Sequence, residues 1–267
     1  MNLLFCIDRQ ALSQMVVCLR SIVKNGGASH YRVYLLHSDL DEGIRENLSR
    51  DFSSMEFYFL TVPQGLFEGF PVTDRYPREI YYRLAAPLLL PRYLNRILYL
   101  DADTIVINPL RSLYSMDFEG NLYAACTHTR DILTKLNRMR LQSKKAVCYI
   151  NSGVLLMNLP LLRWTLDLEQ MAKYVQERKL PLFLPDQDIL TALYGDRVKL
   201  ISSMRYNLSD RVLNLYNADR GLRDWDEDWV RRNTVIIHYC GRNKPWKPDY
   251  TGRLGIFYRE IFDEIAR

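Results

Sequence analysis

The sequence predicts an α/β protein built on a mostly parallel sheet, and three observations lead to that prediction. Over the first hundred residues, short apolar runs alternate with amphipathic helical patterns, which is typical of a parallel sheet with helices on both faces. No linker rich in Pro, Gly or Ser divides the 267 residues, whose 48% hydrophobic content is enough for one full core. The apolar run Ile97–Leu100 ends in Asp101 and Asp103, as a buried strand does when it carries side chains to the ligand-binding edge of a sheet.

The elements can be justified in chain order from hydrophobic periodicity. The first helix is expected at Ala11–Lys24, where Leu12, Met15 and Leu19 share one face, and the Asn-Gly-Gly that follows ends it because glycine accepts the left-handed conformation. Strands are expected at Leu3–Ile7, Tyr31–Leu36, Glu56–Thr61, Arg96–Leu100, Tyr123–Cys126, Gly153–Asn158 and Thr234–His238. The other helices are expected at Asp41–Arg50, from about Ile80, and at Leu161–Lys179, Asp186–Tyr194 and Leu254–Ala266.

Composition narrows the class of protein. The net charge of +5 is mildly basic, but a single short basic stretch does not match a nucleic-acid binder, so anionic small ligands or a membrane surface are the expected partners. The five cysteines contain no CxxC pair, which indicates that most are small core residues or free thiols in a reducing compartment rather than parts of a zinc site or a disulfide framework. The N-terminus lacks the pattern of a secretory signal, and no apolar stretch approaches the roughly 18–20 residues that span a bilayer. These features predict a cytosolic protein.

Two acids and a histidine are the candidate metal ligands. Carboxylates are hard ligands suited to Mg²⁺ or Mn²⁺, and His238, at the end of an apolar strand, can complete the shell. After His238, Gly241 allows a close backbone approach to a phosphate and Lys244 supplies a point charge. Together these residue types predict a site that captures a diphosphate.

Simpler interpretations compete with the functional ones. Asp101 also fits the nucleophile of haloacid-dehalogenase-type phosphatases, although that motif usually ends the first strand, and three strands are expected before it here. On spacing alone, Asn151-Ser152-Gly153 is a turn before a strand. Asp186-Gln187-Asp188 could be an N-cap and acidic first turn for the helix that follows.

Six sequence blocks, taken together, resemble glycosyltransferase family 8, which includes bacterial lipopolysaccharide galactosyl- and glucosyltransferases and, more distantly, glycogenin. The similarity runs over nearly the whole chain. The blocks are Phe5–Asp8, Tyr82–Leu84, Leu98–Asp103, Asn151–Leu155, Asp186–Leu190 and His238–Trp246.

The resemblance implies a single GT-A (Rossmann-like nucleotide-diphospho-sugar transferase) domain over residues 1–267, with a mixed central sheet. It implies a nucleotide-binding half at 1–103 and a half at 104–267 that completes the site and faces the acceptor. It further implies retaining transfer of a hexose from UDP-galactose or UDP-glucose to a glycan or lipid-linked saccharide, with Mn²⁺ or Mg²⁺. A cytoplasmic location with peripheral contact at the inner face of the membrane would suit such acceptors.

The resemblance also implies roles for individual residues. Asp101, Asp103 and His238 would hold the metal, and Gln187 and Asp186 would be catalytic. The donor-binding residues would be Ile7, Asp8, Gln10, Arg83, Asp101, Ala102, Asn151, Ser152, Gly241 and Lys244.

Some features depart from the family's pattern or bear on the reaction. Arg9-Gln10 replaces the acid and Asn often seen after Asp8, and His128 stands where relatives often have an Asp near the sugars, which concerns the choice of hexose and acceptor. A double displacement needs a carboxylate nucleophile, and the amide of Gln187 is a poor one, so same-face attack is favoured. Asp186 could then fix sugar hydroxyls.

A basic segment lies between the strand at Cys126 and Asn151. It is either a solvated helix face or the border of an acceptor site that attracts an anionic glycan or a membrane surface. Its basic residues are Arg130, Lys135, Arg138, Arg140, Lys144 and Lys145. Besides the phosphatase, a sugar-nucleotide-binding protein without transfer activity remains an alternative function.

Overall fold

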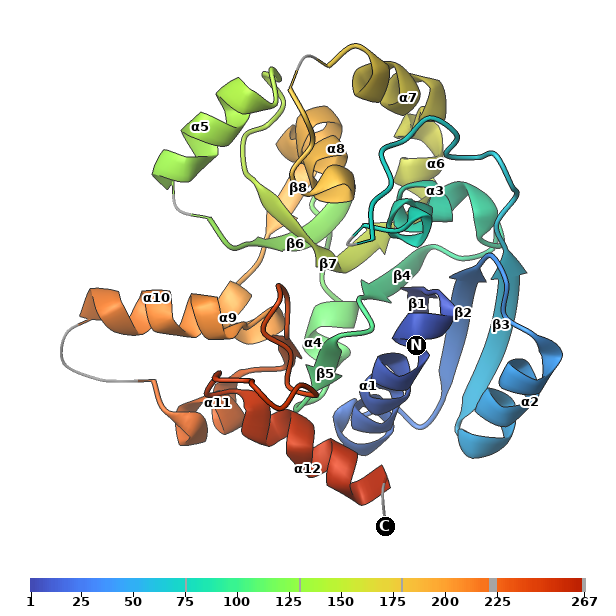
Figure 1. Ribbon diagram of the computed structural model, residues 1–267, viewed down its shortest axis with the longest axis vertical. Coiled ribbons are helices and arrows are strands. Elements are labelled where there is room, and N and C mark those ends of the chain that lie inside the picture. The colour runs from blue at the N-terminus through green and yellow to red at the C-terminus, as the bar shows by residue number, and fades with distance from the viewer. Residues whose placement is uncertain (75, 130, 179, 221–224, 266–267) are drawn as a thin grey trace.

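A computed structural model describes residues 1–265 except 75, 130, 179 and 221–224 (Figure 1). A seven-stranded mixed sheet, in the order β3-β2-β1-β4-β7-β6-β8, forms its centre. β7 alone runs antiparallel to its two neighbours, and the other pairs in this sheet are parallel. The strands are β1 (Asn2–Cys6), β2 (Tyr31–His37), β3 (Met55–Thr61), β4 (Arg96–Leu100), β6 (Tyr123–Thr127), β7 (Ile150–Asn158) and β8 (Val198–Leu200).

A separate two-stranded ladder completes the β-structure. β5 (Thr104–Val106) pairs antiparallel with β9 (Ile236–His238), and Thr104 lies opposite His238. β5 begins within one turn of β4, whereas β9 comes more than a hundred residues later, so this ladder joins distant parts of the chain. It therefore determines which residue of the C-terminal half meets the acids that follow β4.

Helices cover both faces of the sheet and surround the ladder. The long and short helices are α1 (Leu12–Asn25), α2 (Glu42–Asp51), α3 (Tyr82–Leu89), α4 (Arg111–Tyr114), α5 (Asp131–Arg140), α6 (Leu159–Thr165), α7 (Leu168–Gln176), α8 (Pro185–Tyr194), α9 (Ser203–Tyr206), α10 (Asp210–Arg220), α11 (Glu227–Asn233) and α12 (Gly255–Ile265). Short 3-10 turns lie at Arg9–Ala11, Arg78–Tyr81 and Gly195–Arg197. In Figure 1, α3, α6, α7 and α8 lie together at the top of the view, and α10, α11 and α12 lie below.

Side-chain alternation along the strands produces two cores, one on each face of the sheet. In β1, Leu4 packs into the core that α3, α6, α7 and α8 cover, whereas Leu3 and Phe5 pack into the core that α1, α2 and α4 cover. β4 follows the same rule, because Tyr99 and Leu98 belong to different cores. Strands buried on both faces explain why the sequence shows continuous apolar runs there.

Most of the expected elements are present, and two expectations are wrong. The helix expected at Leu161–Lys179 is two helices, because the backbone is extended at Leu166 and Asp167 caps α7 by accepting from the amide of Gln170. Its expected end, Lys179, lies outside the described residues. Asn151-Ser152-Gly153 is not a turn, since all three residues lie within β7.

The elements that periodicity missed are short or strongly polar. β5 and β8 have three residues each, and α10 and α11 carry many charged residues. All five cysteines are free thiols, as their spacing predicts. Over the described part of the chain, every helix falls short of the length and apolarity that a bilayer crossing requires.

Candidate active site

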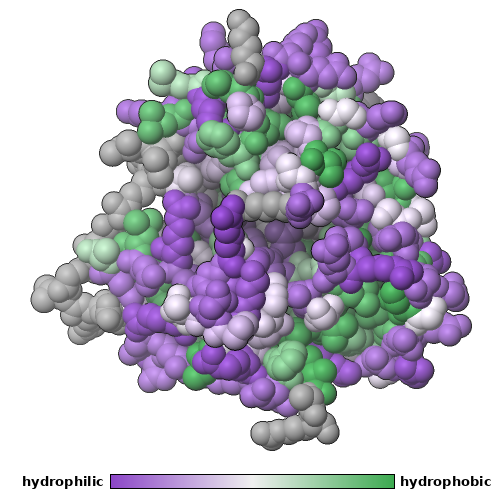
Figure 2. Space-filling model, in the orientation of Figure 1, coloured by the Kyte–Doolittle hydropathy of each residue, from purple (hydrophilic) through white to green (hydrophobic). Residues whose placement is uncertain are grey.

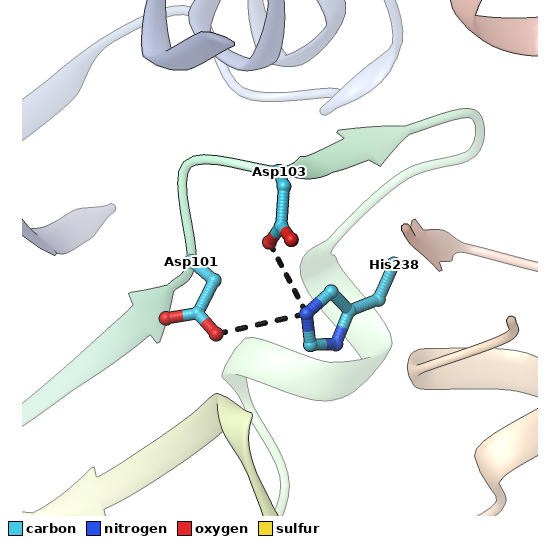
Figure 3. Close-up of side chains that lie close together, drawn as sticks. All are labelled: Asp101, Asp103 and His238. Carbon is cyan, nitrogen blue, oxygen red and sulfur yellow. Dashed lines mark ion pairs between the residues drawn. The ribbon is translucent and has the colours of Figure 1, made fainter. Parts of the chain in front are cut away.

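Three potential metal ligands meet beside the end of β4. Asp101 follows β4, Asp103 precedes β5, and the ladder places His238 at the end of β9 directly beside Asp103. His238 Nε2 lies 3.2 Å from Asp103 Oδ1 and 3.6 Å from Asp101 Oδ2, and Figure 3 shows both carboxylates directed toward the imidazole. One ligand atom from each residue can be chosen so that all lie within 4.8 Å of one another. Two carboxylates and one imidazole form a donor set that suits Mn²⁺ or Mg²⁺. Asp101, Asp103 and His238 therefore form a candidate metal site, named the metal group.

Gly153 keeps the space beside this metal group clear. The backbone carbonyl oxygen of Gly153 accepts a hydrogen bond from the backbone amide of Asp101 at 2.8 Å, so β7 lies directly against the end of β4. A Cβ at Gly153 would stand 2.2 Å from His238 Cε1 and 2.6 Å from Asp101 Oδ2, far inside van der Waals contact. A glycine inside a strand is the sequence signal for such a close approach, although spacing alone favours a turn here.

A chain of hydrogen bonds fixes the orientation of the His238 ring. The amide of Gly153 donates to Asn151 Oδ1 (3.0 Å), and Asn207 Nδ2 donates to the same oxygen (2.9 Å). Because a backbone amide can only donate, the oxygen of Asn151 must face it, and the amide nitrogen of Asn207 must face Asn151. Asn207 Oδ1 is then left to accept from His238 Nδ1 at 2.9 Å, so that His238 Nε2 presents its lone pair to the metal group.

Asn207 was not predicted from the sequence, although it is fully buried. It lies just after α9 and far from the recognisable blocks, and an isolated Asn carries no motif. The residue could be found only through its contacts with His238 and Asn151.

Arg83 joins the metal group to the N-terminal turn of α8. Its guanidinium lies 2.9 Å from Asp101 Oδ1 and 3.3 Å from Asp186 Oδ2, and Nη1 donates to the carbonyl oxygen of Ser152 at 3.0 Å. Arg83 also lies over the ring of Tyr99, whose hydroxyl donates to Asp101 at 2.5 Å. Burial by itself would lower the pKa of Arg83, but Asp101, Tyr99 and Asp186 raise it, and the side chain stays charged.

The three residues Asp186-Gln187-Asp188 point to different places. Asp186 accepts from the Ser152 hydroxyl at 2.7 Å, and the amide of Ser152 donates to Gln187 Oε1 at 3.4 Å, so both reach the candidate site. Burial raises the pKa of Asp186 in spite of Arg83 and Ser152. The N-cap of α8 is Leu184, so the expectation that Asp186 caps this helix is wrong, whereas the acidic first turn is confirmed.

Asp188 faces the other way and has a structural role. It is completely buried, and Arg140 binds it with two hydrogen bonds of 2.6 and 2.8 Å. The hydroxyl of Tyr149 (2.7 Å) and the amide of Phe183 (2.8 Å) also donate to it. This set of contacts attaches the end of α5 to α8.

The basic segment therefore divides into residues of two kinds. Arg140 forms an ion pair with the buried Asp188, so its charge is not free to attract an anionic acceptor. Lys135, Arg138, Lys144 and Lys145 are exposed. Arg130 lies outside the described residues.

Lys244 and Gly241 lie in the loop after β9. Lys244 Nζ pairs with Asp103 and donates to the carbonyl oxygen of Tyr239 at 2.8 Å, so its charge is held beside the metal group. Burial acts to raise the pKa of Asp103, but His238 and Lys244 outweigh it and hold that pKa well below its usual range. Gly241 has φ +98°, a conformation in which L side chains are strained, so glycine is required there for the backbone path.

The residues expected to hold the base and ribose follow β1, next to the end of β4. Ile7 is buried, and Asp8 accepts from the amide of Ala11 at 2.9 Å as the cap of a short 3-10 turn. Gln10 is exposed in that turn, and Ala102 lies between the two acids after β4. Because β1 pairs with β4, these residues share one edge of the sheet with Asp101.

A cavity of about 580 Å³ adjoins His238 on the side of α10. Neither α10 nor the cavity was predicted from the sequence, since α10 has no clear apolar stripe. The lining residues are Ser209, Asp210, Arg211, Asn214, Leu215, Ala218, His238, Tyr239, Cys240 and Asn243. Hydrophilic residues cover much of the face of the molecule shown in Figure 2.

His128 lies beside Asn207 and His238. Its Nε2 lies 2.8 Å from the carbonyl oxygen of Asn207, and its ring centroid lies 6.5 Å from that of His238. Burial and the neighbouring His238 lower its pKa from 6.5 to about 4. The imidazole is therefore neutral near pH 7 and donates from Nε2 to the carbonyl.

We predict that replacing Asn207 weakens divalent metal binding without unfolding the protein. Asn207→Leu removes the acceptor for His238 Nδ1, and loss of such a partner typically costs roughly 10- to 100-fold in metal affinity. Asn207→Asp keeps an oxygen at that position and should bind Mn²⁺ within a few-fold of the wild type. Titration followed by the electron paramagnetic resonance of free Mn²⁺ measures both. Equal affinity of the Leu variant and the wild type would contradict the role of Asn207.

We also predict that His128 makes stability depend on pH. The pKa of His128 is about 4 in the folded chain and 6.5 in the unfolded chain. As the pH falls, His128 therefore binds a proton in the unfolded state before it does so in the folded state. The stabilisation is complete above pH 6.5 and declines toward pH 4, with a slope of up to about 1.4 kcal/mol per pH unit. Urea unfolding between neutral and acidic pH should show a smaller loss for His128→Gln. Parallel losses in the two proteins would refute this assignment.

Comparison with known proteins agrees with the fold. The sequence profile of Glycosyl transferase family 8 matches residues 2–249. A lipopolysaccharide 1,2-glucosyltransferase of Escherichia coli is 24% identical over an alignment of 276 positions, which covers 98% of this chain and 78% of that protein. A lipopolysaccharide 1,3-galactosyltransferase of Salmonella typhimurium is 24% identical over 92% of this chain and 72% of its own length.

Solved structures show the same architecture. The galactosyltransferase LgtC, crystallised with donor and acceptor sugar analogs, superposes with a TM-score of 0.78 at 25% identity, over 99% of this chain and 96% of LgtC. The glycosyltransferase GlyE of Streptococcus pneumoniae shares the fold, with a TM-score of 0.69 at 20% identity over 97% of this chain and 59% of GlyE. The fold is GT-A, and the chain belongs to glycosyltransferase family 8.

Proposed function

We propose that this protein transfers glucose or galactose from UDP-glucose or UDP-galactose to a glycan or lipid-linked saccharide, and that the anomeric configuration is retained. One observation carries the proposal. Asp101, Asp103 and His238 meet at the sheet edge where Arg83 links Asp101 to Asp186, which connects the candidate metal group to the first turn of α8. Glycosyl transfer itself is the activity of the family.

The relatives support the choice of sugar and acceptor class. Those named above transfer glucose or galactose to lipopolysaccharide, and LgtC was crystallised with analogs of a donor and an acceptor sugar. A saccharide acceptor and a sugar-nucleotide donor are therefore the natural substrates to test first.

Within this proposal, residues 1–103 bind the nucleotide and residues 104–267 complete the site. Ile7, Asp8 and Gln10 would line the uracil and ribose pocket, at the same sheet edge as Asp101 and Ala102. The side chain of Asp8 is already oriented by its hydrogen bond to the amide of Ala11. This arrangement supports a base pocket formed before the donor arrives.

Mn²⁺ or Mg²⁺ would be held by Asp101, Asp103 and His238, and the space that Gly153 leaves open supports this fit. A bound divalent ion would stabilise the negative charge that develops on the UDP diphosphate. Lys244, held beside Asp103, would exchange that contact for a phosphate oxygen, and Gly241 would allow the backbone to approach it. Arg83 would keep Asp101 and Asp186 in place while the donor binds.

The positions of the acids support same-face attack rather than double displacement. Asp188 is buried among donors and faces away from the site, and Asp186 is held by Arg83 and Ser152. Gln187 would then shield or orient the oxocarbenium-like carbon. The acceptor hydroxyl forms its bond to the anomeric carbon on the face that UDP leaves, and the departing phosphate oxygen takes the hydroxyl proton.

The acceptor would occupy the cavity between β9 and α10. This cavity borders His238 and Cys240 and offers Arg211 and Asn214 for hydrogen bonds to a saccharide. The exposed residues Arg138 and Lys144 could add attraction for an anionic acceptor from a distance.

The functional test is an assay with UDP-glucose and UDP-galactose, a panel of saccharide acceptors, and Mn²⁺. We expect a glycosylated product whose new linkage is α, as NMR of the anomeric proton will show. A β-linkage would reject retention, and donor binding without any product over the whole panel would favour the alternative of a non-catalytic sugar-nucleotide-binding protein.

The control for metal dependence is Asp103→Asn, together with EDTA. Each should remove most turnover, and UDP should raise the melting temperature only when Mn²⁺ is present. At UDP one hundredfold above its Kd, the expected stabilisation is about 2.7 kcal/mol. Near-normal turnover of the variant in EDTA would exclude the metal assignment.

We predict that Arg211→Ala raises the KM for the acceptor several-fold and leaves the KM for the donor unchanged, because Arg211 lines the cavity but does not touch the metal group. Arg138→Glu combined with Lys144→Glu should raise the acceptor KM only for anionic acceptors and should weaken its salt dependence. Initial rates at low and high salt measure both effects. An unchanged acceptor KM in the Arg211 variant would place the acceptor elsewhere.

A further inference from the structure

A second cavity, of about 490 Å³, lies away from the candidate active site and shares no lining residue with it. Three segments form it: the turn between β5 and α4, the helix α9, and the end of α11. Its lining residues are Asn108, Pro109, Arg111, Ser112, Arg205, Arg232, Asn233 and Val235. Three of these are arginines and none is acidic.

The guanidinium groups of these arginines are unused. Arg111, Arg205 and Arg232 make no side-chain hydrogen bond or ion pair with any described residue, and only Arg205 has a ring contact, with Tyr206. Elsewhere in the described chain, arginines such as Arg83 and Arg140 bind carboxylates. Three like charges around one hollow repel each other unless an anion lies between them.

No acidic residue among those that the structure describes lines the cavity. Glu227 on α11 and Glu260 on α12 form ion pairs with Arg231, which is not a lining residue. The cavity therefore keeps a net positive charge.

Hydrogen bonds between the three segments hold the walls of the cavity in place. Asn108 Nδ2 donates to the carbonyl oxygens of Arg231 (2.7 Å) and Thr234 (2.6 Å), and Asn233 Nδ2 donates to that of Trp229 (2.8 Å). The amide of Val235 donates to the carbonyl oxygen of Arg205 at 2.6 Å. The carbonyl oxygens of Trp229, Arg231 and Thr234, which would repel an anion, thus accept hydrogen bonds within the protein.

We propose that this cavity binds a phosphate group, carried either by a soluble phosphorylated molecule or by a lipid headgroup. A guanidinium presents a planar pair of donors that matches two oxygens of a phosphate, and Ser112 adds a hydroxyl. The hydrogen bonds that join the three segments form the cavity in advance, which reduces the entropy lost on binding. The site is independent of the proposed transfer reaction.

The test compares two triple variants that lose the same positive charge. Arg111→Gln, Arg205→Gln and Arg232→Gln remove the guanidinium groups of the cavity. The matched control, Arg50→Gln, Arg92→Gln and Lys173→Gln, removes three exposed cations elsewhere. Binding of inorganic phosphate is measured by calorimetry in EDTA, so that no metal recruits phosphate to Asp101 and Asp103. Flotation with phosphatidylcholine vesicles, with and without phosphatidic acid, tests the lipid source.

We expect the wild type and the control to bind inorganic phosphate equally, and the cavity variant to bind it at least tenfold more weakly. Vesicle binding that requires phosphatidic acid and is lost in the cavity variant would assign the site to a headgroup. Phosphate binding without vesicle binding would assign it to a soluble ligand. No binding of either probe by the wild type, or equal binding by the cavity variant, would overturn the proposal. Arg205→Gln alone, with a threefold or larger loss, serves if the triple variant does not fold.

Discussion

The buried guanidinium of Arg83 is the interaction on which the site depends. It lies between Asp101, which follows β4, and Asp186, in the first turn of α8, and it also donates to the carbonyl oxygen of Ser152 in β7. Side-chain exposures of 7% for Arg83 and 9% for Asp186 mean that water cannot replace these contacts. Breaking a buried pair of this kind typically costs about 3–5 kcal/mol, because the remaining charge is left without a partner. One residue therefore sets the positions of both a candidate metal ligand and a second acid of the candidate site.

The metal group is organised before any ligand arrives. Asp101 receives hydrogen bonds from Tyr99 and Arg83, and His238 is oriented through Asn207 and Asn151. Each contact fixes a side chain that would otherwise have to be ordered during binding, which is how a protein keeps a charged site ready for a diphosphate. Gly153 contributes by what it lacks, since any side chain there would occupy the space between His238 and Asp101.

The motif Asp186-Gln187-Asp188 shows that one short block can serve two purposes. Successive residues of a helix point about 100° apart, so Asp186 and Gln187 reach the site while Asp188 faces α5. Asp188 then anchors Arg140, and the contact holds in place the segment that carries the exposed basic residues Arg138 and Lys144. The side of the block that faces the candidate site and the side that binds Arg140 therefore belong to the same helical turn.

The sequence by itself determined the fold class, the order of most elements and the three candidate metal ligands. Long apolar periodicities survive in any tertiary context, and acids after a buried strand reach the edge of a sheet whatever lies around them, so Ile97–Leu100 with Asp101 and Asp103 could be interpreted directly. Short elements could not. β5 has three residues and no periodicity, and only its pairing with β9 places His238 beside Asp103. Tertiary structure likewise determines the contact of Asn207 with His238, the cavity along α10 and the grouping of arginines around the second cavity. Contacts between residues far apart in sequence leave no local pattern.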